Sequence, residues 1–428
     1  MSLLILKREV IVLSTYSSPE ERLASNQHLR ELASLVEVLE GRVVFSRALA
    51  LRTHHPATFL STGQVNLLAE DLQGVVCDLI ILDEEISPSQ QRNLSKQLNR
   101  PVIDRTEVIL EVFHRRAKTR EACIQVNLAR EQYALPRLKN RWNHLSKQRG
   151  GGLRQKGEGE QQIELDRRMV ERRITRLERE LQQIRRQREL RRRKRERRSL
   201  PLFALVGYTN SGKSTLLNQL TSANVLTEDR VFATLDTTTR RFQLPNRQDV
   251  LLIDTVGFMR KLPHALIAAF RSTLEEVLYA NFLLHVADAT DPDLAQKIEI
   301  TQRVLGQLQE EDRRKRPSLL LLNKVDQLPS QEKKNELQAT YRRALFLSAK
   351  KGGGIESLLR KMESLLSFSR KRISVRIPYH AYSWVARILE EGQVLSQSIE
   401  ENGLYLEAQV SSSLCRQLHP FLIRKKVP

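Results

Sequence analysis

Nine residues of this sequence form a loop whose composition suits the binding of a phosphate group. Residues 207–215 read GYTNSGKST and follow the apolar run LFALV at 202–206. In the spacing G-x-x-x-x-G-K-S, glycines let backbone N–H groups close around phosphate oxygens, and the start of the following helix adds positive charge. Lys213 can reach the β- and γ-phosphates, and the Ser214 hydroxyl can ligate Mg²⁺. The stretch therefore predicts a nucleoside triphosphate site that uses magnesium.

Two later segments end apolar strands in the polar residues that such a site also needs. LLIDTVGF (251–258) carries Asp254, placed to hold Mg²⁺ through water, and Gly257, whose N–H can meet the γ-phosphate. LLLLNKVD (319–326) ends in Asp326, whose carboxylate is a pure acceptor and matches the adjacent N1–H and N2–H₂ donors of guanine. Adenine has no such donor pair, so Asp326 predicts GTP rather than ATP.

The neighbours of Asp326 complete the predicted base site. Asn323 is expected to contact the base and to hold loops together, while the stem of Lys324 covers the ring plane. A further strand, ALFLSAK (344–350), ends in Ser348-Ala349-Lys350, whose backbone can meet the guanine O6. Four motifs in this order, each after an apolar strand, are specific for a guanine-nucleotide domain.

A GTP switch also needs a threonine before Asp254, to complete the Mg²⁺ shell and to sense the γ-phosphate. The segment FATLDTTTR (232–240) offers Thr234, Thr237, Thr238 and Thr239. Spacing alone does not choose among these four.

The residue after Gly257 is Phe258, where many switch GTPases have the glutamine that orients the attacking water. A phenylalanine side chain neither donates nor accepts, so hydrolysis by the free protein is expected to be slow. Asn210 occupies the N-x-G-K-S position, which resembles a potassium-ligating asparagine in related GTPases. K⁺ there could stabilise charge between the β- and γ-phosphates, and the alternative is that Asn210 only structures the loop.

The elements that would position these residues belong to a chain of 428 residues, enough for two to four domains. Three cysteines, Cys77, Cys123 and Cys415, lie far apart, which fits a reducing cytoplasm and argues against a disulfide framework or a zinc site. No apolar run approaches the ~18 residues of a membrane span, and the N-terminus lacks the pattern of a signal peptide. We therefore expect a cytoplasmic protein.

Apolar periodicity divides the sequence into four parts and predicts an α/β fold. Residues 1–104 alternate strand-like runs with amphipathic helices, as a small α/β domain would. Residues 105–199 predict a long antiparallel helical hairpin. Residues 200–370 predict a P-loop GTPase domain with a mixed, mostly parallel sheet, and residues 371–428 a small α+β C-terminal domain.

The predicted hairpin is strongly basic. Residues 137–199 hold 23 Lys and Arg against 9 Asp and Glu, a surplus of 14 in a chain of net charge +21. Such a block indicates a polyanion, most often nucleic acid, and the alternative is a solvated charged helix. Each helix carries an apolar seam, formed by Ile124, Leu128, Leu135, Leu138, Trp142 and Leu145 in the first and by Val170, Ile174, Leu177, Leu181 and Ile184 in the second.

The stretch GGGLRQKGEGE at 150–160 separates the two seams. Each glycine costs a helix about 1 kcal/mol relative to alanine, so five in eleven residues predict a loop. We expect this loop to form the tip of the hairpin.

Together, GYTNSGKST, FATLDTTTR, DTVGF, NKVD and SAK resemble the G domain of the HflX family of ribosome-associated GTPases. ILDEEISPSQQRNL, VIDRTEVILEVFHRRAKT and GEQQIELDRR upstream are similar as well, so the resemblance covers almost the whole chain and is weakest after residue 371. It implies that Thr234, in F-A-T-L-D, is the metal-ligating switch threonine. It also implies an arm that inserts into the large ribosomal subunit near the peptidyl transferase centre, in a factor that separates stalled ribosomes into subunits, often under heat or antibiotic stress.

The resemblance sets the expected partners and leaves alternatives. We expect a monomer that binds GTP and GDP, the large ribosomal subunit and its rRNA, with Mg²⁺ and, in the potassium interpretation, K⁺ as cofactors. Whether the basic tail IRKKVP also contacts a membrane weakly stays open. Two rival functions are an RNA-modifying enzyme with an accessory G domain, which would need a cofactor or nucleophile site, and a non-catalytic RNA-binding scaffold.

Two segments depart from the family pattern. The family's G-P-G-E near the tip is Gly157-Glu158-Gly159-Glu160 here, and its G-x-G-K in the N-terminal domain is Ser61-Thr62-Gly63-Gln64. The second departure removes the lysine that a further nucleotide site would use.

We expect Ser214 and Thr234 to bind the metal, and Lys213, Thr234, Gly257 and Asn210 to act in catalysis. The residues expected at the GTP site as a whole are Gly207, Tyr208, Thr209, Asn210, Ser211, Gly212, Lys213, Ser214, Phe232, Ala233, Thr234, Leu235, Asp236, Asp254, Thr255, Val256, Gly257, Asn323, Lys324, Val325, Asp326, Ser348, Ala349 and Lys350.

Overall fold

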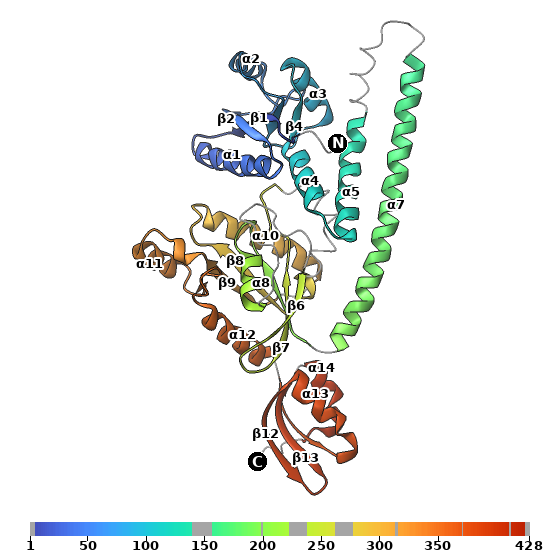
Figure 1. Ribbon diagram of the computed structural model, residues 1–428, viewed down its shortest axis with the longest axis vertical. Helices are drawn as coiled ribbons and strands as arrows, with labels where there is room; N and C mark the ends of the chain where they lie inside the picture. Colours follow the sequence, from blue (N-terminus) through green and yellow to red (C-terminus); the bar gives the residue numbers. More distant parts are fainter. Residues whose placement is uncertain are drawn as a thin grey trace. The chain divides into compact units, whose positions relative to one another are not determined.

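The computed structural model describes residues 5–138, 156–197, 200–221, 238–261, 277–312, 316–369, 371–410 and 412–423 (Figure 1). Its contacts divide the chain into two units, the first running to Ile184 and also including Lys261. The second holds most of the rest, from Arg185. Within the described residues, no helix is long and apolar enough to cross a membrane.

The N-terminal part of the first unit is a parallel four-stranded sheet of order β2-β1-β3-β4. Its strands are β1 (Glu9–Tyr16), β2 (Arg42–Ala50), β3 (Leu79–Leu82) and β4 (Val102–Asp104). Helix α1 (Glu21–Val38) covers one face, and α2 (Thr62–Asp71) and α3 (Pro88–Gln97) cover the other (Figure 1). The β1 and β3 runs are apolar because both faces of these central strands are covered. The predicted α/β architecture is confirmed.

Serine caps start two of these helices. The Ser87 hydroxyl accepts a hydrogen bond from the Gln90 N–H, and the Gln90 side-chain oxygen accepts one from the Ser87 N–H, with proline at the first helical position. Ser61 and Gln64 form the same capping box at α2. The two residues that depart from the family's G-x-G-K, Ser61 and Gln64, therefore serve as the N-terminal cap of α2.

Within the described residues, three α-helices follow the sheet. The helix α4 (Arg105–Arg116) is largely buried and contacts α1 and α5 (Arg120–Ala134). α5 ends at Ala134, and a 3₁₀ turn, η1 (Leu135–Arg137), follows with Pro136 at its centre, so the expected helix is interrupted at this point. Beyond the turn, α7 runs from Lys156 to Arg197.

The helices α5 and α7 lie side by side (Figure 1). Ile124 and Leu128 of α5 share a buried cluster with Leu181 of α7, and the other apolar residues around it are Ile174, Leu177 and Ile184. The predicted pairing of seams is confirmed for these residues. Glu131, the charged interruption of the first seam, lies 3.5 Å from the Arg173 guanidinium.

One prediction about the hairpin is wrong. Because α7 begins at Lys156, Gly157 and Gly159 are helical rather than part of a tip loop. Glycine costs least in the first turn, where backbone N–H groups have no partner inside the helix, and acidic residue types there suit the positive end of the helix. Residues 150–155, like Trp142 and Leu145, lie outside the described residues.

The second unit contains a six-stranded sheet of order β10-β9-β8-β5-β7-β6. The strands β5 (Leu202–Val206), β7 (Asp249–Asp254), β8 (Phe282–Asp288), β9 (Ser318–Asn323) and β10 (Leu345–Phe346) are parallel, and β6 (Thr238–Gln243) is antiparallel to β7. The helices are α8 (Lys213–Thr221), α10 (Leu294–Asp312), α11 (Gln331–Thr340) and α12 (Ile355–Ser369). The predicted mixed, mostly parallel sheet is confirmed.

The C-terminal residues form a small antiparallel sheet of order β11-β13-β12. Its elements are β11 (Lys371–Ile377), α13 (Ser383–Glu391), β12 (Gln393–Glu400), β13 (Gly403–Val410) and α14 (Ser412–Gln417). The helices pack on the sheet through a buried cluster that includes Val375, Ile388 and Leu414. This is the predicted α+β part; most of its basic tail, residues 424–428, lies outside the described residues.

Candidate functional site

The GYTNSGKST loop connects β5 to α8 at the carboxyl end of the parallel strands, where doubly wound sheets bind ligands. Gly207 and Gly212 have φ of 150° and 90°. A Cβ on Gly207 would lie 2.1 Å from the Val286 carbonyl oxygen, and one on Gly212 would lie 2.2 Å from the Asn323 Nδ2. Both positions therefore require glycine.

The Lys213 side chain is buried and folds back onto the phosphate loop. Its ammonium donates to the carbonyl oxygens of Gly207 at 3.2 Å and Tyr208 at 2.8 Å. Burial lowers the pKa of Lys213 to about 8, although nearby Asp254 opposes the shift. The bound phosphate of a nucleotide would offset this desolvation.

Ser214 and Asp254 come together as a magnesium site requires. The Ser214 hydroxyl donates to Asp254 Oδ2 at 2.6 Å, and Asp254 is fully buried at the end of β7. Thr255 is also buried and donates to the Leu205 carbonyl, which fixes the strand end. A hydroxyl and a carboxylate are hard oxygen ligands, so these residues fit Mg²⁺.

The two residues after Val256 lie against the phosphate loop. A Cβ on Gly257 would lie 2.8 Å from Thr209 Cα and 3.0 Å from Lys213 Nζ, so only glycine permits this approach. Phe258 donates its N–H to the Gly207 carbonyl at 3.0 Å and accepts from the Thr209 N–H at 2.8 Å. Its side chain is 1% exposed and packs in a core cluster with residues of β5. Phe258 therefore points away from a nucleotide.

Asn323 links two loops of the site. Its Nδ2 donates to the Ser211 carbonyl at 2.9 Å, and its Oδ1 accepts from the Ala349 N–H at 2.9 Å. The side chain holds the phosphate loop and the SAK segment together, as expected. Because both ends of the amide are already engaged and the residue is 2% exposed, the expected contact with the base stays a prediction.

Asp326 lies in the turn η2 (Val325–Gln327) that follows β9. A hydrogen bond from Ser348 lowers the pKa of Asp326, so its carboxylate stays an acceptor at neutral pH. The Lys351 ammonium lies 3.6 Å from Asp326 Oδ2. Sequence reasoning missed Lys351, although it directly follows the SAK motif.

Lys324 adopts a left-handed backbone, φ 61°, and its ammonium lies 2.8 Å from Asp288 Oδ2. Asp288 was also missed, and its position at the end of the apolar strand β8 could have indicated it. The ion pair orients the lysine stem that the sequence placed against the base. Lys350 is exposed.

The remaining predicted residues divide into two groups. Asn210 is exposed with φ 59°, a conformation that asparagine tolerates better than most residues, so its type has a structural reason. The switch residues Phe232, Ala233, Thr234, Leu235 and Asp236 lie outside the described residues. Elsewhere in the described ranges, no group of three or more His, Cys, Asp or Glu residues could hold a metal.

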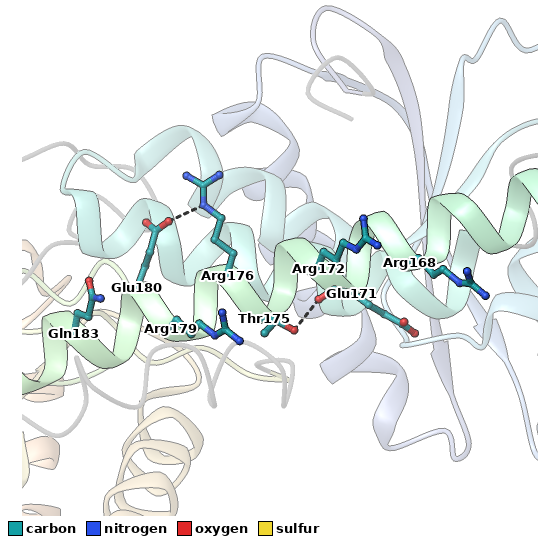
Figure 2. A pocket seen from close by; sticks show the side chains of 8 residues that line it. All are labelled: Arg168, Glu171, Arg172, Thr175, Arg176, Arg179, Glu180 and Gln183. Carbon is teal, nitrogen blue, oxygen red and sulfur yellow. Dashed lines mark hydrogen bonds and ion pairs between the residues drawn. The ribbon is translucent and has the colours of Figure 1, made fainter.

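A second surface of interest is the arginine-rich face of α7. Figure 2 shows a hollow whose described lining consists of Arg168, Glu171, Arg172, Thr175, Arg176, Arg179, Glu180 and Gln183. Arg176 pairs with Glu180 at 2.9 Å, and Arg168 with Glu164 at 3.3 Å. Arg172 and Arg179 form no ion pair with any residue that the structure describes.

Family models and related sequences match most of this chain. Three family models match the chain: GTP-binding GTPase N-terminal over residues 26–114, GTP-binding GTPase middle region over 116–195, and 50S ribosome-binding GTPase over 202–324. The chain is 42% identical to GTPase HflX of Chlamydia pneumoniae over 418 residues, covering 97% of this chain and 88% of the relative. It is 40% identical to GTPase HflX of Akkermansia muciniphila over 424 residues, covering 96% of each. A crystal structure of a GTP-binding protein from Sulfolobus solfataricus in complex with GDP is 24% identical, with a TM-score of 0.41, and the match covers 83% of this chain and 98% of that one.

Proposed function

Because this chain belongs to the HflX family of GTPases, we propose that it binds the large ribosomal subunit in its GTP form and separates stalled ribosomes into subunits. The chain hydrolyses GTP to GDP and phosphate, as its family and its G domain imply. In our proposal, hydrolysis releases the factor from the subunit. The name of the matching domain model, 50S ribosome-binding GTPase, supports the choice of partner.

The nucleotide site supports the following division of roles. Lys213 and the backbone N–H groups of its loop bind the phosphates, Asp326 accepts from guanine, and the Gly257 N–H meets the γ-phosphate. Ser214, Asp254 and the switch threonine Thr234 would hold Mg²⁺, which neutralises charge on the β- and γ-phosphates when bound. Asn323 keeps the phosphate loop and the SAK loop in register.

The observation that carries the ribosome proposal is the charge on α7. Arg172, Arg179, Arg185 and Arg186 are exposed and form no ion pair with any described residue. Guanidinium groups that have no ion-pair partner among the described residues and recur along one helix suit the phosphates of rRNA. We propose that α7 is an rRNA-binding arm and that its first residues, Gly157-Glu158-Gly159-Glu160, together with the stretch before them, lead the arm into the subunit.

Pelleting with large subunits tests this function. We expect co-sedimentation with a non-hydrolysable GTP analogue and much less with GDP, and dissociation of whole ribosomes followed by light scattering. Absence of binding in every nucleotide state would contradict the proposal and favour an RNA-modifying enzyme or a scaffold that uses another RNA.

Two sets of substitutions on α7 give a matched comparison. Changing Arg172, Arg179 and Arg185 to Gln should weaken subunit binding and reduce the salt slope of the binding constant by roughly 0.7–0.9 per lost phosphate contact. The control changes Arg167, Arg168 and Arg176, each within an i,i+4 ion pair, and removes the same charge. Equal losses in both sets would show that only net charge matters, whereas no loss in either would remove α7 from the interface.

We further propose that K⁺ binds at Asn210 and assists hydrolysis. Asn210 is exposed at the phosphate loop, so its side chain amide is accessible to a cation beside the phosphates. Its left-handed backbone equally supports a purely structural role. GTP turnover in K⁺ and in Na⁺ at equal ionic strength, for wild type and Asn210→Gly, separates the two, because glycine keeps the backbone and removes only the amide. Equal rates in the two salts for wild type would exclude potassium.

A further inference from the structure

The Tyr208 side chain joins three parts of the G domain. It is 7% exposed, and its hydroxyl accepts a hydrogen bond from the backbone N–H of Arg260 at 2.9 Å. The ammonium of Lys297, in α10, lies 5.1 Å from the centre of its ring and is itself ion-paired with Asp291. The Lys297 ammonium therefore covers one face of the ring, and the hydrogen bond from Arg260 joins the hydroxyl to the segment that follows the DTVG motif.

This hydrogen bond extends a short ladder between the phosphate loop and that segment. The ladder's other two bonds run from the Phe258 N–H to the Gly207 carbonyl and from the Thr209 N–H to the Phe258 carbonyl. Both end at Phe258. The Tyr208 hydroxyl holds the chain two residues further on, at Arg260, so the backbone of 257–260 is held on both sides of Met259.

Gly257 lies at the start of this held segment. The space beside its Cα is bounded by Thr209 and by the Lys213 ammonium, at 2.8 and 3.0 Å from an ideal Cβ. Lys213 is the residue expected to bind the γ-phosphate, and the Gly257 backbone lies beside its ammonium, where it could meet the same phosphate. A freely moving segment would have to be ordered on binding, which costs affinity.

We propose that the Tyr208 hydroxyl is a positioning group that holds residues 257–260 for the γ-phosphate and so favours GTP over GDP. GDP has no γ-phosphate and makes no bond to Gly257. The hydroxyl should therefore affect the triphosphate and leave the diphosphate almost unchanged. This role belongs to the side chain of Tyr208 and is separate from the backbone contacts of its loop with phosphate.

Tyr208→Phe tests the proposal, because it removes the hydroxyl and keeps the ring over Lys297. We expect affinity for a non-hydrolysable GTP analogue to fall about fivefold, as for loss of one hydrogen bond, while GDP affinity changes less than twofold. The Arg260 amide should exchange its hydrogen faster. Tyr341→Phe, at the end of α11, removes a hydroxyl from the same domain and should change none of these quantities.

Three outcomes would overturn the inference. If both nucleotides lose affinity equally, Tyr208 supports the phosphate loop alone. If neither loses affinity while exchange at Arg260 accelerates, the bond forms but does not set nucleotide preference. If exchange at Arg260 is unchanged, the hydroxyl does not hold the segment.

Discussion

At the scale of single residues, the G-domain motifs were predictable because each polar side chain stands at the end of a buried strand. Asp254, Asn323 and Ser348 all lie at the carboxyl edge of one sheet, as the order of their strands in the sequence indicated. The Tyr208–Arg260 and Lys324–Asp288 contacts were not predictable as pairs, although the position of Asp288 at the end of β8 marked it as a candidate site residue. Each depends on how two loops from different strands approach, which local pattern does not encode.

Asp326 gives the first prediction at this scale. Asp326→Asn replaces one acceptor oxygen with an amide donor that faces the guanine donors, so GTP affinity should fall at least tenfold and preference should move towards xanthine nucleotides. Competition binding with GTP and XTP measures the change. Unchanged discrimination would remove Asp326 from the base site.

Lys213 gives a pH dependence. Its pKa in the free protein is about 8, and bound phosphates favour the charged form and raise the pKa. The complex therefore binds more protons than its separated components above pH 8, so affinity should fall as pH rises, by up to about tenfold per unit.

The measurement is the GDP dissociation constant between pH 7 and 9. Lys213→Arg serves as the control, because a guanidinium stays charged throughout this range. A decline in wild type that the arginine variant does not show assigns the effect to Lys213. Parallel curves would assign it to the nucleotide or to another group.

At the scale of elements, the sequence predicted the apolar seams of α5 and α7 but not the residues at which these helices end or begin. Periodicity placed Ile124, Leu128 and Leu181 on facing sides because a packed seam must repeat. Helix propensity predicts that Gly157 and Gly159 lie outside the helix, whereas the structure includes both in the first turn of α7. Helix propensity predicts a helix end poorly when the rest of a long helix offsets the free-energy cost of a glycine.

Arg137, in the turn η1 after α5, anchors that end of the helix to the N-terminal sheet. Its guanidinium donates to the Ile86 carbonyl at 2.7 Å and lies 3.4 Å from Asp104 Oδ2, and it stacks 3.6 Å from the centre of the Tyr133 ring. Asp104 is fully buried, and burial raises its pKa despite the opposing effect of Arg137. One side chain thus connects the end of β4, the loop before α3 and the end of α5.

Arg137→Met should destabilise the fold by about 3 kcal/mol, because it leaves Asp104 without its cation. A carboxyl whose folded pKa is raised is less costly once protonated, so the difference from wild type should shrink as pH falls from 7 towards 5. Urea unfolding at the two pH values measures both effects. The exposed Arg22→Met serves as the control, and a loss that is independent of pH would assign the cost to packing rather than to Asp104.

At the scale of the whole molecule, Phe258 offers no group that could orient the attacking water, so we expect the free protein to hydrolyse GTP slowly. Phe258 occupies the position after Gly257, and its N–H, its carbonyl and its side chain are all engaged in the domain core. The water-orienting group must come from elsewhere. In our proposed function the docked ribosome supplies or orders it, so hydrolysis accompanies binding.

Phe258→Gln distinguishes two explanations of slow hydrolysis: that the docked ribosome supplies the water-orienting group, or that the domain lacks only a glutamine at position 258. Because the side chain at 258 points into the core, glutamine should bury an unsatisfied amide, cost about 1–3 kcal/mol in stability, and fail to accelerate hydrolysis. Single-turnover GTP hydrolysis with and without large subunits, for wild type, Phe258→Gln and Phe258→Leu, measures the outcome. We expect slow turnover by all three free proteins and at least tenfold stimulation of wild type by subunits. Fast hydrolysis by free Phe258→Gln would mean that residue 258 turns towards the nucleotide, and fast hydrolysis by the free wild type would mean that no partner is required.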